Sequence, residues 1–232
     1  MEHAKTIEEL LKILRDDRSV PELRCYFNID TSDAPPKYTG AMFDTLGRDG
    51  GRDDVCDVIT PYDLLAVACL DVTVPTPVAL DLVEGQLGRE IAVHLRDIPV
   101  KVDLGEVGAK ELVAPDSPAD KAWGLLEASD NVGWVIAGKI LARKRPRLIP
   151  VWDNVVKCAF GRPPRPAWLW LDGRLQDSRL REELDQLHRA AELPEMVSSL
   201  RVLDVVVWMR HRCEHRRARC PGLKLSGGPN GC

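Results

Sequence analysis

Gly133 and Asp153, twenty positions apart, are the two residues whose types and spacing could do chemistry. Gly133 ends the segment Asn131-Val132-Gly133, and asparagine and glycine tolerate the positive φ that a tight turn requires. Such a turn leaves backbone N–H groups of the following helix for a phosphate. Asp153 stands where a predicted helix needs an N-cap, and its carboxylate could also activate water. The sequence therefore predicts an anion-binding turn and a separate carboxylate.

A basic stretch surrounds these two residues. Residues 131–168 hold 8 Lys/Arg against 1 Asp/Glu, in a protein whose net charge is −4. Such an island attracts anions, and we interpret it as a surface for the DNA phosphate backbone; the alternative is a solvated turn. The residues predicted to bind DNA are Asn131, Val132, Gly133, Trp134, Lys139, Arg143, Lys144, Arg145 and Arg147.

The elements that must position these residues are helices. Thr6, Thr60 and Ser117 each precede a run of apolar residues at helical spacing, as N-caps do. Such patterns predict about eight helices and no alternating strand, which defines an all-α helical bundle. Residues 77–94 are expected to form one helix, whereas 18–37 and 98–116 read as irregular.

The chain divides into three parts by the same reasoning. Residues 1–37 hold an N-terminal helix and an irregular segment, and residues 38–215 form a single all-α domain. Residues 216–232 are a basic, glycine-rich tail that we expect to be disordered.

Composition excludes some classes of function. The chain has no run of eighteen apolar residues and no signal-peptide pattern, so we expect a cytoplasmic location and no membrane partner. It has no glycine-rich phosphate loop, and we predict no cofactor. Four cysteines have apolar neighbours and are expected to be reduced thiols: Cys25, Cys56, Cys69 and Cys158.

The end of the last predicted helix offers four zinc-ligand types, His211, Cys213, His215 and Cys220. Their spacing matches no zinc knuckle, and the neighbouring arginines would oppose a cation. We therefore interpret this stretch as a solvated basic helix end and predict no metal.

The window Ser129 to Phe160 resembles the helix-hairpin-helix signature of the base-excision DNA glycosylases. Gly133 matches the second glycine of the hairpin, Ala137 matches the alanine of the motif, and Asp153 matches its aspartate. The resemblance implies a two-subdomain helical fold in which the hairpin grips a DNA phosphate. It also implies that Asp153 assists water attack at the sugar carbon, with the base flipped into a pocket lined by tryptophans such as Trp134 and Trp152.

The window also departs from that signature. Asn131 replaces the first hairpin glycine, and Asp130 places an acid beside the predicted phosphate site. Val135 occupies the position of the catalytic lysine, which excludes Schiff-base lyase chemistry. Any enzyme would therefore be a monofunctional DNA N-glycosylase, and a relative that has lost catalysis would still bind DNA.

Most of the chain resembles an uncharacterised family of unknown function that is common in high-GC Gram-positive bacteria. The stretches that carry this resemblance lie within residues 38–209 and include YTGAMF, ITPYDLLAVACLDVTVP, NVGWVIAGKILARKRPRLIPVWDNVV and SSLRVLDVVVWM. This resemblance implies no activity. A non-enzymatic protein-interaction module with a protein partner is therefore the alternative to a DNA-binding protein.

Overall fold

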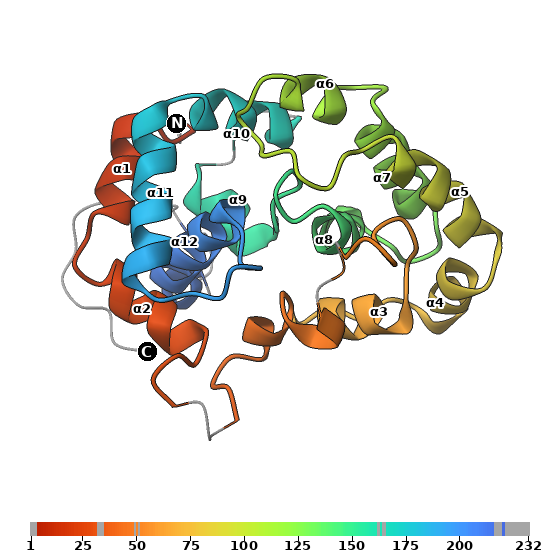
Figure 1. Cartoon of the computed structure of the whole chain (residues 1–232), viewed down its shortest axis with the longest axis horizontal. Helices are drawn as coiled ribbons and strands as arrows, with labels where there is room; N and C mark the ends of the chain where they lie inside the picture. Colours follow the sequence, from red (N-terminus) through yellow and green to blue (C-terminus); the bar gives the residue numbers. More distant parts are fainter. Residues whose placement is uncertain are drawn as a thin grey trace.

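The computed structural model describes residues 4–31, 35–48, 50, 52–161, 163, 166–215 and 220. All regular structure in this part of the chain is helical, as the sequence predicts. The helices form two groups on either side of α8 (Trp134–Lys144), which Figure 1 shows at the left and the right of the molecule.

The first group surrounds the long helix α12 (Ser199–His215). It contains α1 (Ile7–Leu14), α2 (Ser19–Tyr26) and α11 (Ser178–Ala190), and α12 contacts all three. α12 also packs on α9 (Asn154–Ala159). Because every residue over 200–207 is buried, α12 forms the centre of this group.

The second group consists of the shorter helices from the first half of the chain. They are η1 (Thr39–Met42), η2 (Leu46–Arg48), α3 (Pro61–Ala68), α4 (Thr76–Val83), α5 (Gln86–Arg96), α6 (Ala109–Val113) and α7 (Pro118–Glu127). α7 packs on α5, α6 and α8, and α3 packs on α8. α10 (Ala167–Leu175) contacts α6 and α11, and one buried hydrophobic cluster extends through both groups.

The predicted helix starts are confirmed at atomic detail. Thr6 and Thr60 form capping boxes with Glu9 and Asp63, and Ser117 caps α7. In each case a side-chain oxygen accepts a backbone N–H that would otherwise lack a helical partner. Local sequence therefore determines where these helices begin.

The structure has more helices than the eight predicted. Residues 18–37 contain α2, whose first turn includes Pro21, where a missing N–H costs no helical hydrogen bond. The helix expected over 77–94 is divided into α4 and α5 at Gly85, where a Cβ atom would lie 1.8 Å from an oxygen of Asp81. The short helices α6 and α10 account for the remaining difference.

The N-terminal segment is part of the folded core. Leu10, Leu14 and Leu23 are fully buried, so the N-terminal segment contributes to the core. The tail predicted over 216–232 lies outside the described residues, apart from Cys220. Across the described residues, every helix falls short of the length and apolar character that crossing a membrane requires.

Candidate functional site

The predicted turn connects α7 to α8. Asn131 has a φ of 60°, and the Val132 N–H donates to the Ser129 carbonyl at 3.1 Å. Asn131 and Gly133 are exposed, whereas Val132 is buried in the core. Gly133 caps α8 without a side-chain hydrogen bond, which leaves the first N–H groups of the helix for another acceptor.

The tryptophans singled out by the sequence lie beside this turn. Trp134 is half-buried, and the Lys157 ammonium lies 5.1 Å from the centre of its ring. Trp134 and Trp152 line a small cavity of about 170 Å³ together with Trp123 and Trp168. This cavity is separate from the one that contains Asp153, so these two side chains do not line the pocket in which a base would meet the carboxylate.

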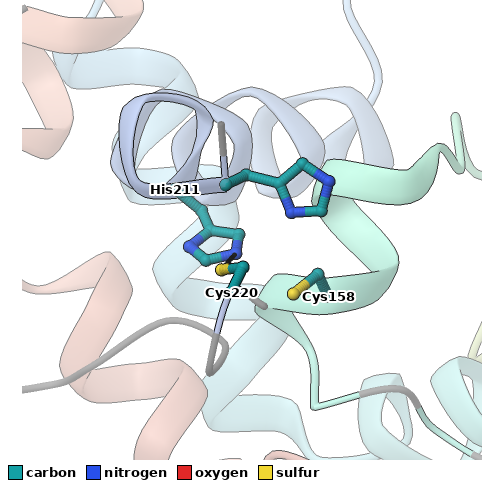
Figure 2. Close-up of side chains that lie close together, drawn as sticks. Cys158, His211 and Cys220 are labelled. Atoms are coloured by element: carbon teal, nitrogen blue, oxygen red, sulfur yellow. Dashed lines mark hydrogen bonds between the residues drawn. The ribbon is translucent and has the colours of Figure 1, made fainter. Parts of the chain in front are cut away.

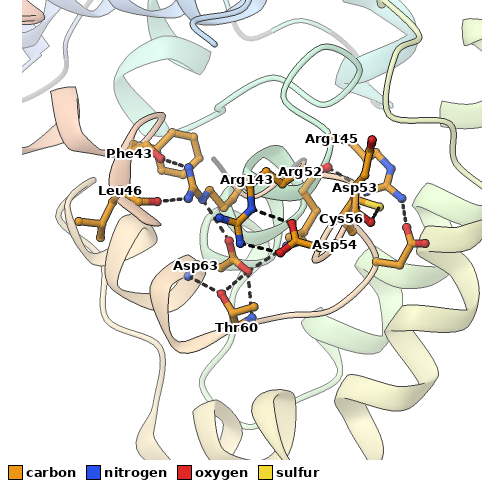
Figure 3. Close-up of polar contacts among 12 residues, drawn as sticks. Phe43, Leu46, Arg52, Asp53, Asp54, Cys56, Thr60, Asp63, Arg143 and Arg145 are labelled. Carbon is orange, nitrogen blue, oxygen red and sulfur yellow. Dashed lines mark hydrogen bonds and ion pairs between the residues drawn. The ribbon is translucent and has the colours of Figure 1, made fainter. Parts of the chain in front are cut away.

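The basic side chains at the end of α8 point into the fold. Arg143 and Lys144 are 3% and 0% exposed, and both bind Asp63, with Arg143 Nε to Oδ1 at 3.1 Å and Lys144 Nζ to Oδ2 at 2.9 Å (Figure 3). Burial lowers the pKa of Lys144, and the Asp63 charge opposes this shift. The Arg143 guanidinium also donates to three backbone carbonyls, those of Phe43, Asp44 and Leu46.

Arg145 forms a second buried centre of hydrogen bonds. Its side chain is 1% exposed, and Nη2 lies 2.5 Å from Oδ1 of Asp57. The remaining donors of the guanidinium bind backbone carbonyls of Cys56, Leu95, Ile98 and Lys144. Arginine suits this position because its five N–H donors can satisfy several carbonyls at once. Arg145 therefore joins α8 to the loop before α3 and to the end of α5.

The two remaining basic residues of the prediction have different surroundings. Lys139 is 3% exposed, and its Nζ donates to the Leu70 carbonyl at 2.9 Å. Arg147 is about half exposed and pairs with Asp103. Of the predicted phosphate-binding side chains, four are thus inside the fold and one is paired at its surface. Asn131, Gly133 and the start of α8 are the parts of the prediction that the structure places at the surface.

Asp153 caps α9, as the sequence predicts. Its Oδ1 accepts the Val156 N–H at 2.9 Å, which fixes the direction of the carboxylate. The residue is half-buried and lines a cavity of about 600 Å³. A carboxylate held in this way keeps a fixed position at the cavity wall.

Aromatic side chains from three segments line this cavity. Tyr26 stacks on Tyr38 with ring centres 5.3 Å apart, and Trp208 lies edge-on to Tyr38 at 6.0 Å. The Arg212 guanidinium is 5.0 Å from the centre of the Tyr38 ring. Stacked aromatic rings beside a cation form a surface that suits a planar, electron-rich ligand.

Charged groups line the cavity as well, and the Arg201 guanidinium donates to the Tyr26 hydroxyl. Arg201 binds Asp44 at 3.0 Å and also pairs with Asp204, and all three are almost completely buried. Burial raises the pKa of Asp204 to about 7, against the opposing effect of Arg201. Burial also lowers the pKa of Lys139. Asp153 therefore shares its cavity with an acid that changes protonation near neutral pH.

Sequence reasoning missed most of the cavity wall. Tyr26 lies in the segment 18–37 that was expected to be irregular and carries no chemical motif, and Tyr38 follows directly after that segment. Arg201 and Asp204 did leave a signal, because they are charged residues three positions apart within the apolar run of α12. Charged residues are rarely buried unless they are paired, so that pattern could have indicated a buried ion pair.

The fold and the site together define a class of protein: an all-helical protein with a half-buried carboxylate in a cavity lined by aromatic and charged side chains. Comparison with protein families gives the narrower assignment: the chain matches a family of unknown function (DUF6308) over residues 19–211 and belongs to that family. The predicted membership of an uncharacterised family is thus confirmed. Neither the curated proteins nor the solved structures include a match to the chain.

Proposed function

We propose that the protein is a monofunctional DNA N-glycosylase of the helix-hairpin-helix type, with Asp153 as its catalytic carboxylate. The observation that carries this proposal is the position of Asp153, which caps α9 through one oxygen and lines the cavity of about 600 Å³. That volume lies within the roughly 300–1,000 Å³ of small-molecule sites and is sufficient for a flipped nucleobase.

In the proposed reaction Asp153 acts on the sugar. The C1′–N bond breaks, and its electron pair leaves with the base, so the sugar becomes an oxocarbenium ion. The Asp153 carboxylate stabilises this cation and accepts a proton from the water that attacks C1′. The departing base takes up a proton, and the products are a free base and an abasic site. Val135 stands at the position of the glycosylase lysine, so the residue that forms the Schiff base in the lyase members is not present there.

The aromatic wall supports a base as the bound group. Tyr38 and Trp208 present rings at the cavity, and stacking of a base on an aromatic side chain contributes about 1–3 kcal/mol. Asn154, next to the carboxylate, offers an amide that can read the hydrogen-bonding edge of a base. In this proposal Tyr38 and Trp208 take the place of Trp134 and Trp152 as the surfaces that hold the base.

The phosphate contacts of the proposal shift from side chains to backbone. Arg143, Lys144 and Arg145 are engaged inside the fold, so a phosphate would bind the N–H groups at the start of α8. Trp134 is in the first turn of α8, and Lys157 on α9 lies beside its ring. Lys157 therefore supplies a positive charge close to the start of α8. With fewer cations at the contact, affinity for DNA should fall less steeply with salt than a basic-patch protein shows.

A non-enzymatic protein-interaction module is the second candidate. The observation that favours it is the same neutralisation of Arg143, Lys144 and Arg145 inside the fold, in a chain whose net charge is −4. This candidate assigns no reaction to Asp153 and treats it as a helix cap.

The experiment that tests the proposal is a base-release assay on duplexes that carry different damaged or mismatched bases. The variants are Asp153→Asn and, as a matched control, Asp177→Asn. Asp177 also caps a helix, α11, through its side chain, but it does not line the cavity. Asparagine caps helices about as well as aspartate, so both variants should fold.

We expect wild type and Asp177→Asn to release a free base from at least one duplex and to leave an uncleaved abasic strand. Asp153→Asn should lose about 100-fold or more of the rate. Equal rates in the two variants would show that Asp153 is only a cap. Absence of both base release and duplex binding in wild type would favour the protein-interaction module.

A further inference from the structure

Two cysteines and two histidines meet where α9, α12 and Cys220 come together. Cys158 lies on α9, His211 and His215 lie one turn apart on α12, and one ligand-type atom from each of the four residues falls within 4.8 Å of all the others. Figure 2 shows the thiols of Cys158 and Cys220 and the imidazole of His211 directed at one another. Sγ of Cys220 lies 3.3 Å from Nε2 of His211.

The helical geometry explains why this set differs from the one considered in the sequence. Residues four apart share a helix face, so His211 and His215 point the same way, whereas Cys213 lies between them on another face. Cys158, more than fifty positions earlier, provides the fourth ligand because α9 packs on α12. A ligand supplied by a distant helix is not visible in local spacing.

We propose that Cys158, His211, His215 and Cys220 bind a structural zinc ion. Two thiolates and two imidazoles are the ligand set that tetrahedral zinc takes in structural sites, with Zn–S near 2.3 Å and Zn–N about 2.0–2.1 Å. Those bond lengths place ligand atoms roughly 3.3–3.8 Å apart, which the Cys220–His211 distance of 3.3 Å already matches. Four protein ligands fill the coordination sphere, so the ion has a structural role and no open position for substrate.

The surroundings of the cluster favour a bound cation over four neutral side chains. Cys158 is 2% and Cys220 9% exposed, and Nδ1 of His215 is buried without a hydrogen-bond partner among the described residues. Removing such polar atoms from water costs free energy unless they gain a partner. Coordination of zinc by the cluster offsets that cost.

The zinc ion would stabilise the cavity wall. Cys158 follows Asp153 by five positions on the same short helix, and His215 belongs both to the cluster and to the lining of the Asp153 cavity. An ion bound here holds α9 against α12 and fastens Cys220 to both. The inference stands on the four ligands and does not depend on the proposed glycosylase activity.

The test is the zinc content of the full chain, purified without a histidine tag and with thiols kept reduced. We expect about one zinc ion per chain by elemental analysis, and Co²⁺ in its place should give the visible absorption of a tetrahedral thiolate site. Cys220→Ser and Cys158→Ser should lose most of the metal. Cys69→Ser is the matched control, because this half-buried thiol is not one of the four clustered ligands and its loss should leave the zinc content unchanged.

Wild-type protein decides the matter even if a ligand variant fails to fold. Removal of zinc by a chelator should lower the melting temperature of wild type, and added zinc should restore it, since bound metal contributes folding free energy. Zinc below a tenth of an equivalent with no Co²⁺ spectrum would overturn the proposal. A zinc content that Cys220→Ser leaves unchanged would also overturn it. So would a Cys158–Cys220 disulfide in protein that was purified with reductant.

Discussion

Two networks of buried charge occupy this protein, and they differ in what they face. Arg143, Lys144 and Arg145 at the end of α8 are enclosed by Asp63, Asp57 and backbone carbonyls. Arg201 and Asp204 on α12 are equally buried, together with Asp44 from the segment between η1 and η2, but Arg201 and Asp204 line the cavity that contains Asp153. The first network is enclosed by the fold, whereas the second borders a cavity that a ligand can enter.

The difference shows that the most basic stretch of the chain has a structural role. The end of α8 binds the loops around Phe43, Cys56 and Ile98 through arginine donors, so these positive charges hold the second helix group together. The Arg201 network also joins segments, because the guanidinium on α12 binds Tyr26, Gly40 and Asp44. It differs in bordering the cavity, where burial raises the pKa of Asp204 to about 7. Substitutions in the two networks should therefore have different consequences.

The largest expected effect is that of Arg145→Met in the first network. Methionine fills similar volume but leaves the carbonyls of Cys56, Ile98 and Lys144 without the guanidinium donor. Each unsatisfied buried group costs about 1–3 kcal/mol, so we expect the three together to lower the free energy of unfolding by about 3–9 kcal/mol. Urea denaturation followed by circular dichroism measures it. A loss below 1 kcal/mol would show that Arg145 does not hold these loops.

Asp63→Asn should come next in size. The substitution keeps the shape of the side chain but removes the negative charge that Arg143 and Lys144 share. Breaking a buried ion pair from one side typically costs about 3–5 kcal/mol, and the two cations then repel without compensation. We expect a loss of about 3 kcal/mol by the same denaturation measurement. A second change, Lys144→Met, should recover part of it, and no recovery would contradict the pairing.

Asp204→Asn should change the pH dependence of stability in the second network. The folded pKa of about 7 lies above the ordinary 3.8, so the folded state favours the protonated acid. That contribution to stability is complete below about pH 4 and is lost as pH rises through 7. Asparagine stays neutral, and Arg201 keeps Asp44 as its partner.

We therefore expect Asp204→Asn to gain stability relative to wild type between pH 5 and pH 8, by an amount on the order of 2 kcal/mol. Melting temperatures of both proteins across this range measure the gain. A stability difference that stays constant with pH would show that Asp204 does not titrate there.

The smallest effect should come from Arg147→Met, which serves as the contrast to Arg145→Met. Arg147 is half exposed and pairs with Asp103 at the surface, where an ion pair contributes between about 0 and 1 kcal/mol. We expect a loss below 1 kcal/mol, decreasing further at high salt. A loss as large as that of Arg145→Met would contradict the distinction between a buried structural arginine and an arginine paired at the surface.

The parts of the molecule that the sequence predicted are those with local causes. Thr60 and Asp153 cap their helices because the capping oxygen and the backbone N–H that donates to it lie three residues apart, and Asn131 adopts the positive φ that its turn requires. Helical periodicity gave the all-α class for the same reason. The break between α4 and α5 at Gly85 depends on a local close approach that periodicity does not encode.

The parts that the sequence did not predict depend on distant partners. Arg143 and Asp63 are 80 positions apart, and Arg145 and Ile98 are 47 apart. The sequence around the basic stretch does not show these partners, and the stretch was therefore predicted to be exposed. The cavity is built in the same way, from Tyr26, Asp153 and Asp204 on separate helices. Only the packing of those helices brings the site together.

The most direct test of the central claim, that Asp153 stabilises a cationic sugar, needs no knowledge of the substrate base. Affinity is measured for a duplex with a positively charged pyrrolidine abasic analogue and for one with its neutral tetrahydrofuran counterpart, in wild type, Asp153→Asn and Asp177→Asn. An oxocarbenium mimic should bind wild type and Asp177→Asn about 100-fold more tightly than the neutral duplex, and this ratio should approach one in Asp153→Asn. A ratio near one in wild type, or an unchanged ratio in Asp153→Asn, would contradict the account.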